Sequence, residues 1–297
     1  YELLASYIET ADYTDKNDLG NVNINSSIDQ IGWRGFAGKQ VGEALVSFTD
    51  INDTYASLVY TYQMAEETAG ATNYYNVEEY YKVRYTDQQV YLLDYQRSME
   101  QIIDTSSVNV SSNTLSVGVT SDDSEYLSNE TGTIVSFVQS GELFEYNQNK
   151  QSFTKVYGFI DDPTDARQCY GQHNIRILNI DETGNMDFVV YGYMNRGKHE
   201  GESGIDLYHY DSIKQESIEQ VFIATTHSYQ ILNADFSDLL YENANGDFYI
   251  MMGGTLAKVG LDNLSTKELI TNLKSDQYAV SSSGRYVAWM TEDDVAD

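Results

Sequence analysis

The sequence is poor in cysteine, in positive charge and in long apolar runs. Cys169 is the only cysteine among 297 residues, so no disulfide can form within the chain. Only 17 lysines and arginines oppose 46 acidic residues, and the net charge is -29. Nucleic acid is therefore excluded as a partner, because phosphate binding needs a basic face. No apolar run approaches the roughly 18 residues of a spanning helix, so we expect no direct membrane insertion of this fragment.

The acidic charge and the first residue suggest an extracytoplasmic location. A negative field keeps a protein soluble and attracts cations, whereas an anionic membrane surface would repel it. The chain begins with Tyr1 and not with methionine, so we expect that a signal peptide or an N-terminal anchor has been removed. We therefore expect a protein that is secreted or anchored to the cell surface.

Tyrosine is abundant, and the pattern of the chain favours β-structure. The 26 tyrosines suit pleated, half-buried surfaces, so the composition predicts an all-β fold. Residues 1–36 differ from the rest: Leu3, Leu4, Tyr7 and Ile8 fit a short amphipathic helix, and a loop rich in Asp, Asn and Gly follows. We expect an N-terminal segment over residues 1–36 and one β-propeller-like domain over residues 37–297.

A strand-turn-strand unit recurs four times along that domain. The aligned leucines are Leu92, Leu143, Leu207 and Leu256, which are separated by 51, 64 and 49 residues. Each copy has an alternating strand, a polar turn and a second short strand, and the copies cover residues 91–104, 142–157, 206–223 and 255–270. Internal repeats of this length are typical of arrays of small sheets.

A second hairpin follows each of these units. Residues 108–120 match residues 278–290, and residues 177–191 match residues 231–241 with three extra residues in the turn. Two hairpin types alternating about every 50 residues predict a four-stranded sheet repeated radially, which is a β-propeller. Another all-β arrangement stays open.

The chain ends after the first hairpin of a new unit, so the propeller is either truncated or closed by strands within residues 40–64. Residues 65–74 are the best candidate for a linker or loop.

Two segments also resemble known propeller repeats. The stretch Ser281-SSGRYVAW-Met290 resembles a strand of bacterial propellers of the TolB type. Residues 179–192 resemble the FG-GAP repeat, whose loop alternates Asp or Asn with Gly before an apolar strand. Residues 141–297 also resemble uncharacterised extracytoplasmic proteins of Gram-positive gut bacteria. The resemblance implies a propeller architecture and a location outside the cytoplasm, but no specific activity.

The segment NIDETGNMDFVVYG, residues 179–192, has the spacing of a calcium loop. Calcium takes six to eight oxygen ligands, and an alternating loop supplies them from positions 1, 3, 5, 7 and 9 with glycine at 6. Gly184 falls at position 6, and Val190 stands at position 12, where an EF-hand carries glutamate. We expect either a weak Ca²⁺ site or a plain hairpin turn. The ligands would be Asn179, Asp181, Thr183, Asn185 and Asp187.

Two long loops contain most of the remaining charged and potentially reactive side chains. They cover residues 161–173 and 195–204, and enlarged loops on a rigid scaffold are where ligands bind. A single histidine in residues 199–202 rules out a zinc-protease motif, and a nucleophile formed by Cys169 and His173 has no supporting motif. The candidate ligand-binding residues are Asp161, Asp162, Asp165, Arg167, His173, Arg196, His199 and Glu200.

The sequence supports two functions. We favour a non-catalytic, extracytoplasmic binding or regulatory module that recognises a protein or glycan at the cell surface through its loop face. The alternative is a propeller enzyme that acts on carbohydrate with loop carboxylates. A displaced pKa among carboxylates that converge in a pocket would favour the enzyme, and a broad exposed face would favour the binding module.

Overall fold

The computed structural model describes most of the chain, which divides into two compact units. The described residues are 19–106, 108, 110–111, 114–120, 124–238, 240–243, 247–260, 265–274, 276–281 and 286–290. One unit comprises Tyr1–Tyr126 and Thr133–Gly171, and the other comprises Leu127–Gly132 and Gln172–Asp297. The helix predicted around Leu3 lies outside the described residues. Neither helix of the described part has the length or the apolar run needed to cross a membrane.

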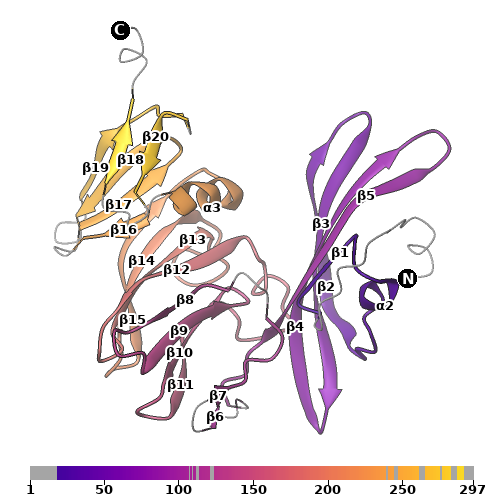
Figure 1. The fold of residues 1–297 in the computed structure, drawn as a ribbon, viewed down its shortest axis with the longest axis horizontal. Helices are drawn as coiled ribbons and strands as arrows, with labels where there is room; N and C mark the ends of the chain where they lie inside the picture. The colour runs from indigo at the N-terminus through magenta and orange to yellow at the C-terminus, as the bar shows by residue number, and fades with distance from the viewer. Residues whose placement is uncertain are drawn as a thin grey trace. The chain divides into compact units, whose positions relative to one another are not determined.

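The first unit contains a five-stranded antiparallel sheet with the order β1-β5-β4-β3-β2 (Figure 1). The strands are β1 (Asn21–Asn23), β2 (Lys39–Ile51), β3 (Tyr55–Thr68), β4 (Ala71–Tyr85) and β5 (Val90–Ile102). Residues 65–74, predicted as a linker or loop, are instead the tip of the β3–β4 hairpin. Ala69 and Gly70 both have positive φ there, as a two-residue hairpin turn requires. The boundary predicted between residues 36 and 37 stays a prediction.

The prediction of a strand-turn-strand unit at residues 91–104 is wrong, because β5 runs through this segment without a turn. Tyr95, Arg97 and Met99 alternate with more exposed residues and point to the buried face. On that face the short helix α2 (Ile28–Ile31) packs beside β1, and the side chain of Ser27 caps its first turn. Arg97 donates hydrogen bonds to the carbonyl oxygens of Gln30 and Ile31, at 3.0 and 2.9 Å, and thereby anchors this helix to the sheet.

Three four-stranded antiparallel sheets follow in chain order, so the fold is all-β and propeller-like, as the sequence predicts. In each of these sheets, every strand pairs with the strand that precedes or follows it in the chain. The first sheet comprises β8 (Tyr126–Ser128), β9 (Ile134–Gln139), β10 (Glu142–Asn147) and β11 (Ser152–Tyr157). The second comprises β12 (His173–Ile180), β13 (Met186–Tyr193), β14 (Ser203–Asp211) and β15 (Glu216–Ala224). The third comprises β16 (Leu240–Glu242), β17 (Asp247–Met252), β18 (Thr255–Gly260) and β19 (Ser265–Ile270).

The three sheets share one irregularity. Directly after Leu143, Leu207 and Leu256, the pairing of the third strand with the fourth shifts by one residue. The extra residues on the fourth strands are Val156, Gln220 and Leu269, so each sheet carries the same β-bulge. The three predicted hairpins that contain these leucines are therefore confirmed, and they are true structural repeats.

The hairpin predicted at residues 231–241 is wrong, because most of that segment forms helix α3 (Tyr229–Asp238). Leu232 and Phe236, one turn apart on the helix, are buried between the second and third four-stranded sheets. They pack with Val189 and Leu207 from one sheet and with Ile250 from the other. The helix contacts β13 and β17 and so fills the space between these sheets.

Two small hairpins complete the described part of the chain. One consists of β20 (Tyr278–Val280) and β21 (Val287–Trp289), which pair as predicted for residues 278–290. The other consists of β6 (Val110–Ser111) and β7 (Thr114–Leu115), within the hairpin predicted at residues 108–120. The β20–β21 hairpin packs against the third four-stranded sheet, around Met251, Leu256 and Leu273. The strands that contain residues 40–64 belong to the five-stranded sheet.

Candidate functional site

The predicted ligand-binding residues are divided between the two units. Asp161, Asp162, Asp165 and Arg167 belong to the first unit, whereas His173, Arg196, His199 and Glu200 belong to the second. Each group is therefore described within its own unit.

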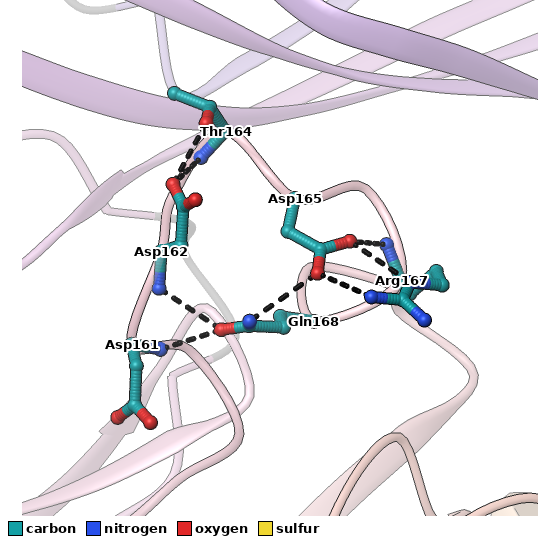
Figure 2. A network of polar contacts seen from close by, with 6 residues as sticks. All are labelled: Asp161, Asp162, Thr164, Asp165, Arg167 and Gln168. Carbon is teal, nitrogen blue, oxygen red and sulfur yellow. Dashed lines mark hydrogen bonds and ion pairs between the residues drawn. The ribbon is translucent and has the colours of Figure 1, made fainter.

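In the first unit, the carboxylates of Asp162 and Asp165 hold their own loop together (Figure 2). Asp162 Oδ1 accepts hydrogen bonds from the backbone nitrogen and the hydroxyl of Thr164, at 2.9 and 2.7 Å. Asp165 accepts from Arg167 through the backbone nitrogen and the guanidinium, both at 3.0 Å. Hydrogen bonds from the side chains of Thr164 and Arg167 lower the pKa of Asp162 and Asp165, respectively. The carboxylate groups of Asp162 and Asp165 are therefore ionised, and their oxygens stabilise the turn by accepting hydrogen bonds from within the loop.

Gln168 ties the two ends of this loop together. Its Oε1 accepts hydrogen bonds from the backbone nitrogens of Asp161 and Asp162, at 2.8 and 2.9 Å. Cys169 follows directly and is buried, and burial raises the pKa of its thiol to about 12. A thiol with such a pKa is neutral at physiological pH, so Cys169 is not an activated nucleophile.

The predicted calcium loop forms a compact turn between β12 and β13. Both carboxylate oxygens of Asp181 accept hydrogen bonds within the loop, from the backbone nitrogens of Thr183 and Asn185, the hydroxyl of Thr183 and the side-chain amide of Asn185. Burial opposes the ionised form of Asp181, but these hydrogen bonds outweigh it and lower the pKa. Asp187 accepts from Asn179 Nδ2 at 2.9 Å and pairs with His209 Nδ1 at 2.7 Å. The hydrogen bonds thus join Asp181 with Thr183 and Asn185, and Asn179 with Asp187, and the calcium site itself stays a prediction.

The other predicted residues of the second unit lie on β12 and in the β13–β14 loop. His173 is buried on β12 opposite Gly192, Arg196 is half-buried, and Glu200 is exposed. Of this group, His199 has the most distinctive surroundings. Its imidazole stacks on the ring of Phe222, with 3.7 Å between the ring centroids and 10° between the planes. Gly204 makes room for this ring, since a Cβ atom there would collide with Phe222.

His199 faces two carboxylates from the adjoining strands. One nitrogen of its ring, a carboxylate oxygen of Asp206 on β14 and one of Glu219 on β15 all lie within 4.8 Å of one another. The distance from His199 Nε2 to Glu219 Oε1 is 3.3 Å, and Lys198 Nζ lies 2.7 Å from the same oxygen. Among the described residues, this is the group whose histidine and carboxylate atoms could together hold a metal ion.

Asp206 is the most unusual member of this cluster. Only 1% of the residue is exposed, and its Oδ1 has no hydrogen-bond partner among the described residues. Its other oxygen accepts from the hydroxyl of Tyr208 at 2.7 Å. Burial raises the pKa of Asp206 to about 7; the hydrogen bond from Tyr208 opposes this shift, and the negative charge of Glu219 adds to it. A half-satisfied carboxylate in such a place is costly unless a cation neutralises it.

The β-bulge of the second sheet brings Glu219 to this cluster. Asp206 lies opposite Phe222, and Tyr208 lies opposite Glu219 because Gln220 is the extra residue. Without the bulge, Gln220 would take the place of Glu219 on the face of Asp206. We did not predict Asp206 or Glu219 as site residues. The signal that could have found them is the alignment of the repeats, in which Asp206 takes the place of Glu142, one residue before the aligned leucine.

A separate polar groove of about 460 Å³ lies on the five-stranded sheet. Residues of β1, β4 and β5 line it, among them Asn21, Glu78, Tyr80, Asp94 and Gln96. Its size suits a small ligand, and its amide and carboxylate groups suit hydroxyl-rich molecules. No motif in the sequence pointed to this groove.

No protein-family model matches the chain, and no curated protein matches it. Among solved structures, the chain is similar to the extracellular domain of a protein described as a one-component system from B. thetaiotaomicron, with 11% identity and a TM-score of 0.32. That match covers 76% of this chain and 27% of the other. A match to tricorn protease has 9% identity and a TM-score of 0.23, and it covers 81% of this chain and 27% of the protease. At these TM-scores, neither similarity indicates a shared activity.

Proposed function

We propose that this chain is a non-catalytic, extracytoplasmic binding module that recognises a protein partner. The observation that carries the proposal is the open edge of the five-stranded sheet, residues 46–51 of β2. We propose that an extended segment of the partner pairs with this edge as an added strand. This is the recognition mode known as β-strand addition, in which backbone hydrogen bonds give affinity and alternate side chains give specificity.

Three large apolar side chains are uncovered on this open edge. Val46, Phe48 and Ile51 are 53%, 64% and 67% exposed, respectively. In the β2–β3 register, Val46 lies opposite Tyr60, and Phe48 lies opposite Leu58. Tyr60 lies next to the buried Tyr62 on the same face of β3, with one residue between them. The apolar face of the sheet therefore continues from β3 onto β2, but its side chains are buried or half-buried on β3 and exposed on β2. Exposed apolar patches of this kind mark interaction sites.

The backbone of β2 supports the same proposal. In the described part of the chain, β3 is the strand that pairs with it, so its other edge has no strand partner. Near the start of β2, Gly42 has positive φ, and a Cβ atom there would lie 2.6 Å from the carbonyl oxygen of Thr164. The loop of Asp162 and Asp165 thus approaches the first part of the strand. Proteins usually protect such edges, and β2 carries β-bulges, yet the apolar side chains of residues 46–51 stay exposed, so this part is a candidate contact surface.

The composition supports the extracytoplasmic part of the proposal. A net charge of -29 keeps a protein soluble at a surface and disfavours contact with nucleic acid. The lone cysteine is buried, so its thiol is shielded from oxidation in an oxidising compartment.

Site-specific photocrosslinking in the producing cell tests the proposal. A benzophenone amino acid replaces Phe48 in one variant and Ser47 in the other, since these exposed neighbours are in regular register with β3 and point to opposite faces of β2. We expect a discrete crosslinked protein from position 48 and much less from position 47. Phe48→Ser, combined with a crosslinker at Ile51, should abolish this product. Equal crosslinking at both positions, or none at either, would overturn the proposal.

The carbohydrate-active enzyme remains the second candidate, because Asp206 and Glu219 converge and the pKa of Asp206 is displaced upward. A general acid must reach the substrate within hydrogen-bond distance, whereas Asp206 is almost completely buried. We therefore rank this candidate second. Hydrolysis of a polysaccharide panel by the wild type, lost in Asp206→Asn, would reverse the ranking.

A further inference from the structure

We propose that His199, Asp206 and Glu219 form a binding site for a divalent transition-metal ion of the zinc class. This inference goes beyond the proposed function and does not depend on it, because the site belongs to the second unit and the open edge belongs to the first. The argument rests on the ligand spacing, an unpartnered oxygen, a comparison between the repeats and the orientation of the histidine.

The spacing of the ligand atoms is close to what a metal ion requires. Two ligands bound tetrahedrally to zinc at 2.0–2.1 Å lie about 3.3 Å apart. His199 Nε2 and Glu219 Oε1 are 3.3 Å apart, and the Asp206 oxygen completes a set within 4.8 Å. Modest closing movements of these side chains would bring all three atoms to bonding distance. The metal would take the place of the proton between His199 Nε2 and Glu219 Oε1.

The unpartnered oxygen of Asp206 points independently to a missing cation. Residues as buried as Asp206 normally satisfy every polar atom, yet its Oδ1 has no hydrogen-bond partner in the described part of the protein. The carboxylate of Glu219, which lies within 4.8 Å, repels a charge on Asp206. A bound cation would satisfy the oxygen and neutralise the repulsion together.

The first four-stranded sheet contains an internal reference for this site. Glu142 precedes Leu143 as Asp206 precedes Leu207, and Lys155 occupies the position of Glu219 beside the bulge. Glu142 is 1% exposed, and Lys155 Nζ lies 2.8 Å from its Oε1, so this buried acid has a built-in cation. In the second sheet an acid stands in place of the strand lysine, and the β13–β14 loop supplies a histidine together with the exposed Lys198, which pairs with Glu219. Two carboxylates and an imidazole at this position are the donor set expected for a metal site.

The orientation of His199 also fits a ligand. Phe222 fixes the ring plane by stacking, and Nδ1 lies 3.7 Å from Glu202 Oε1. Metal-binding histidines usually direct their second nitrogen to a carboxylate or carbonyl, which holds the ring and raises its basicity. Glu202 is itself fixed by the loop, since its backbone nitrogen donates to the carbonyl oxygen of His199 at 3.0 Å, and its carbonyl accepts from Met194 at 2.9 Å.

The donor set determines the class of metal. One imidazole and two carboxylates suit Zn²⁺, and three protein ligands leave a position for water or for a partner's side chain. Calcium needs six to eight oxygens, so we expect it to bind here much more weakly. Lys198 competes for the site, because its ammonium occupies Glu219 Oε1 at 2.7 Å in this structure. The lysine side chain is 72% exposed and can move into solvent when a metal arrives.

Isothermal titration of the EDTA-treated full chain with Zn²⁺ tests the proposal. We expect one ion per chain. Asp206→Asn and, as a less buried second variant, Glu219→Gln should each weaken binding by about tenfold or more. Lys198→Gln should tighten it, because the competing cation is removed. His209→Gln is the matched control: His209 also pairs with an acid of the second sheet, Asp187, and should leave binding unchanged.

A melt in EDTA shows that each variant is folded. Asp206→Asn should melt at or above the wild type there, since it removes a buried charge beside Glu219, and zinc should no longer raise its melting temperature. Anomalous diffraction at the zinc edge should place the ion between His199, Asp206 and Glu219. Absence of binding, binding that Asp206→Asn and Glu219→Gln leave intact, or equal loss in His209→Gln would overturn the proposal.

Discussion

One position in the repeat shows how a single side chain determines local chemistry. The residue before the aligned leucine is Glu142 in the first four-stranded sheet, Asp206 in the second and Thr255 in the third. The neutral threonine needs no cation, Glu142 has Lys155, and Asp206 lies near His199, Lys198 and Glu219. The β-bulge beside this position is the same in all three sheets, so the strands differ here in their side chains, whereas His199 and Lys198 come from the long β13–β14 loop of the second sheet.

The Glu142–Lys155 pair gives a prediction at the residue scale. Burial raises the pKa of Glu142, and the charge of Lys155 opposes that shift. Lys155→Met leaves the buried carboxylate without its cation, so we expect a loss of about 2 kcal/mol in the free energy of unfolding at pH 8. This loss is smaller than the roughly 3–5 kcal/mol of a fully buried pair, because Lys155 is 31% exposed.

The pH dependence of this loss follows from the raised pKa. A carboxyl group whose pKa is raised on folding stabilises the fold below its unfolded pKa, and this contribution disappears as the pH rises through the folded pKa. Lys155→Met raises that pKa further, so its cost should be largest at pH 8 and should shrink at lower pH as Glu142 takes up a proton. Urea unfolding at pH 8 and at pH 5 measures this change. The double variant Glu142→Gln, Lys155→Met should recover most of the stability, and an equal cost at both pH values would contradict the account.

At the scale of elements, the sequence predicted the hairpins wherever turn residues separated two apolar strands. Leu143, Leu207 and Leu256 mark true equivalents, because each is buried on a third strand beside the same bulge. The match failed for Leu92. Residues 96–99, Gln-Arg-Ser-Met, look like a polar turn but contain no glycine, proline or asparagine, and the alternation of the strand continues through them.

The second error shows the limits of local similarity. Residues 231–241 share the start Ile-Leu-Asn with residues 177–179, yet Leu232 and Phe236 have helical spacing and form the buried side of α3. The true partner of the β12–β13 hairpin is the β16–β17 hairpin. Asn243 pairs with Asp247 there as Asn179 pairs with Asp187, and a phenylalanine follows the aspartate in both.

The turn between β12 and β13 gives a prediction at the element scale. Because Asp181 accepts four hydrogen bonds within the turn, Asp181→Ala should lower the free energy of unfolding by about 1 kcal/mol in EDTA. Asp181→Asn keeps an acceptor oxygen and should recover much of this loss. Thermal melts of the three proteins provide the measurement, and an unchanged melt of the alanine variant would show that the turn does not depend on Asp181.

Millimolar calcium, added in the same melts, tests the predicted metal loop. Weak sites of this type fill in the millimolar range. If the loop binds calcium, the melting temperature of the wild type rises and the rise disappears in the Asp181→Ala, Asp187→Ala double variant. If calcium has no effect, residues 179–187 are a turn held by hydrogen bonds.

At the scale of the whole molecule, the long β13–β14 loop drew attention to His199, but the sequence did not indicate which residues lie beside it. Asp206 and Glu219 lie within strands, and 46 acidic residues offer too many pairs for a choice by sequence alone. Their proximity depends on the register of β14 with β15 and on the bulge at Gln220. Register is a tertiary property, because one residue of slip moves every side chain to the other face.

The net charge of -29 gives the prediction for the whole molecule. With 46 acidic residues against 17 basic ones, most surface carboxylates have no lysine or arginine to pair with, and their mutual repulsion destabilises the compact state. Salt screens exposed charges over about 10 Å at 0.1 M. We therefore expect the melting temperature to rise by about 3–6 °C between low salt and roughly 0.5 M sodium chloride. Choline chloride should give a similar rise, which would separate screening from specific sodium binding. A fall with salt would mean that attractive ion pairs, such as Lys155 with Glu142, outweigh the repulsion.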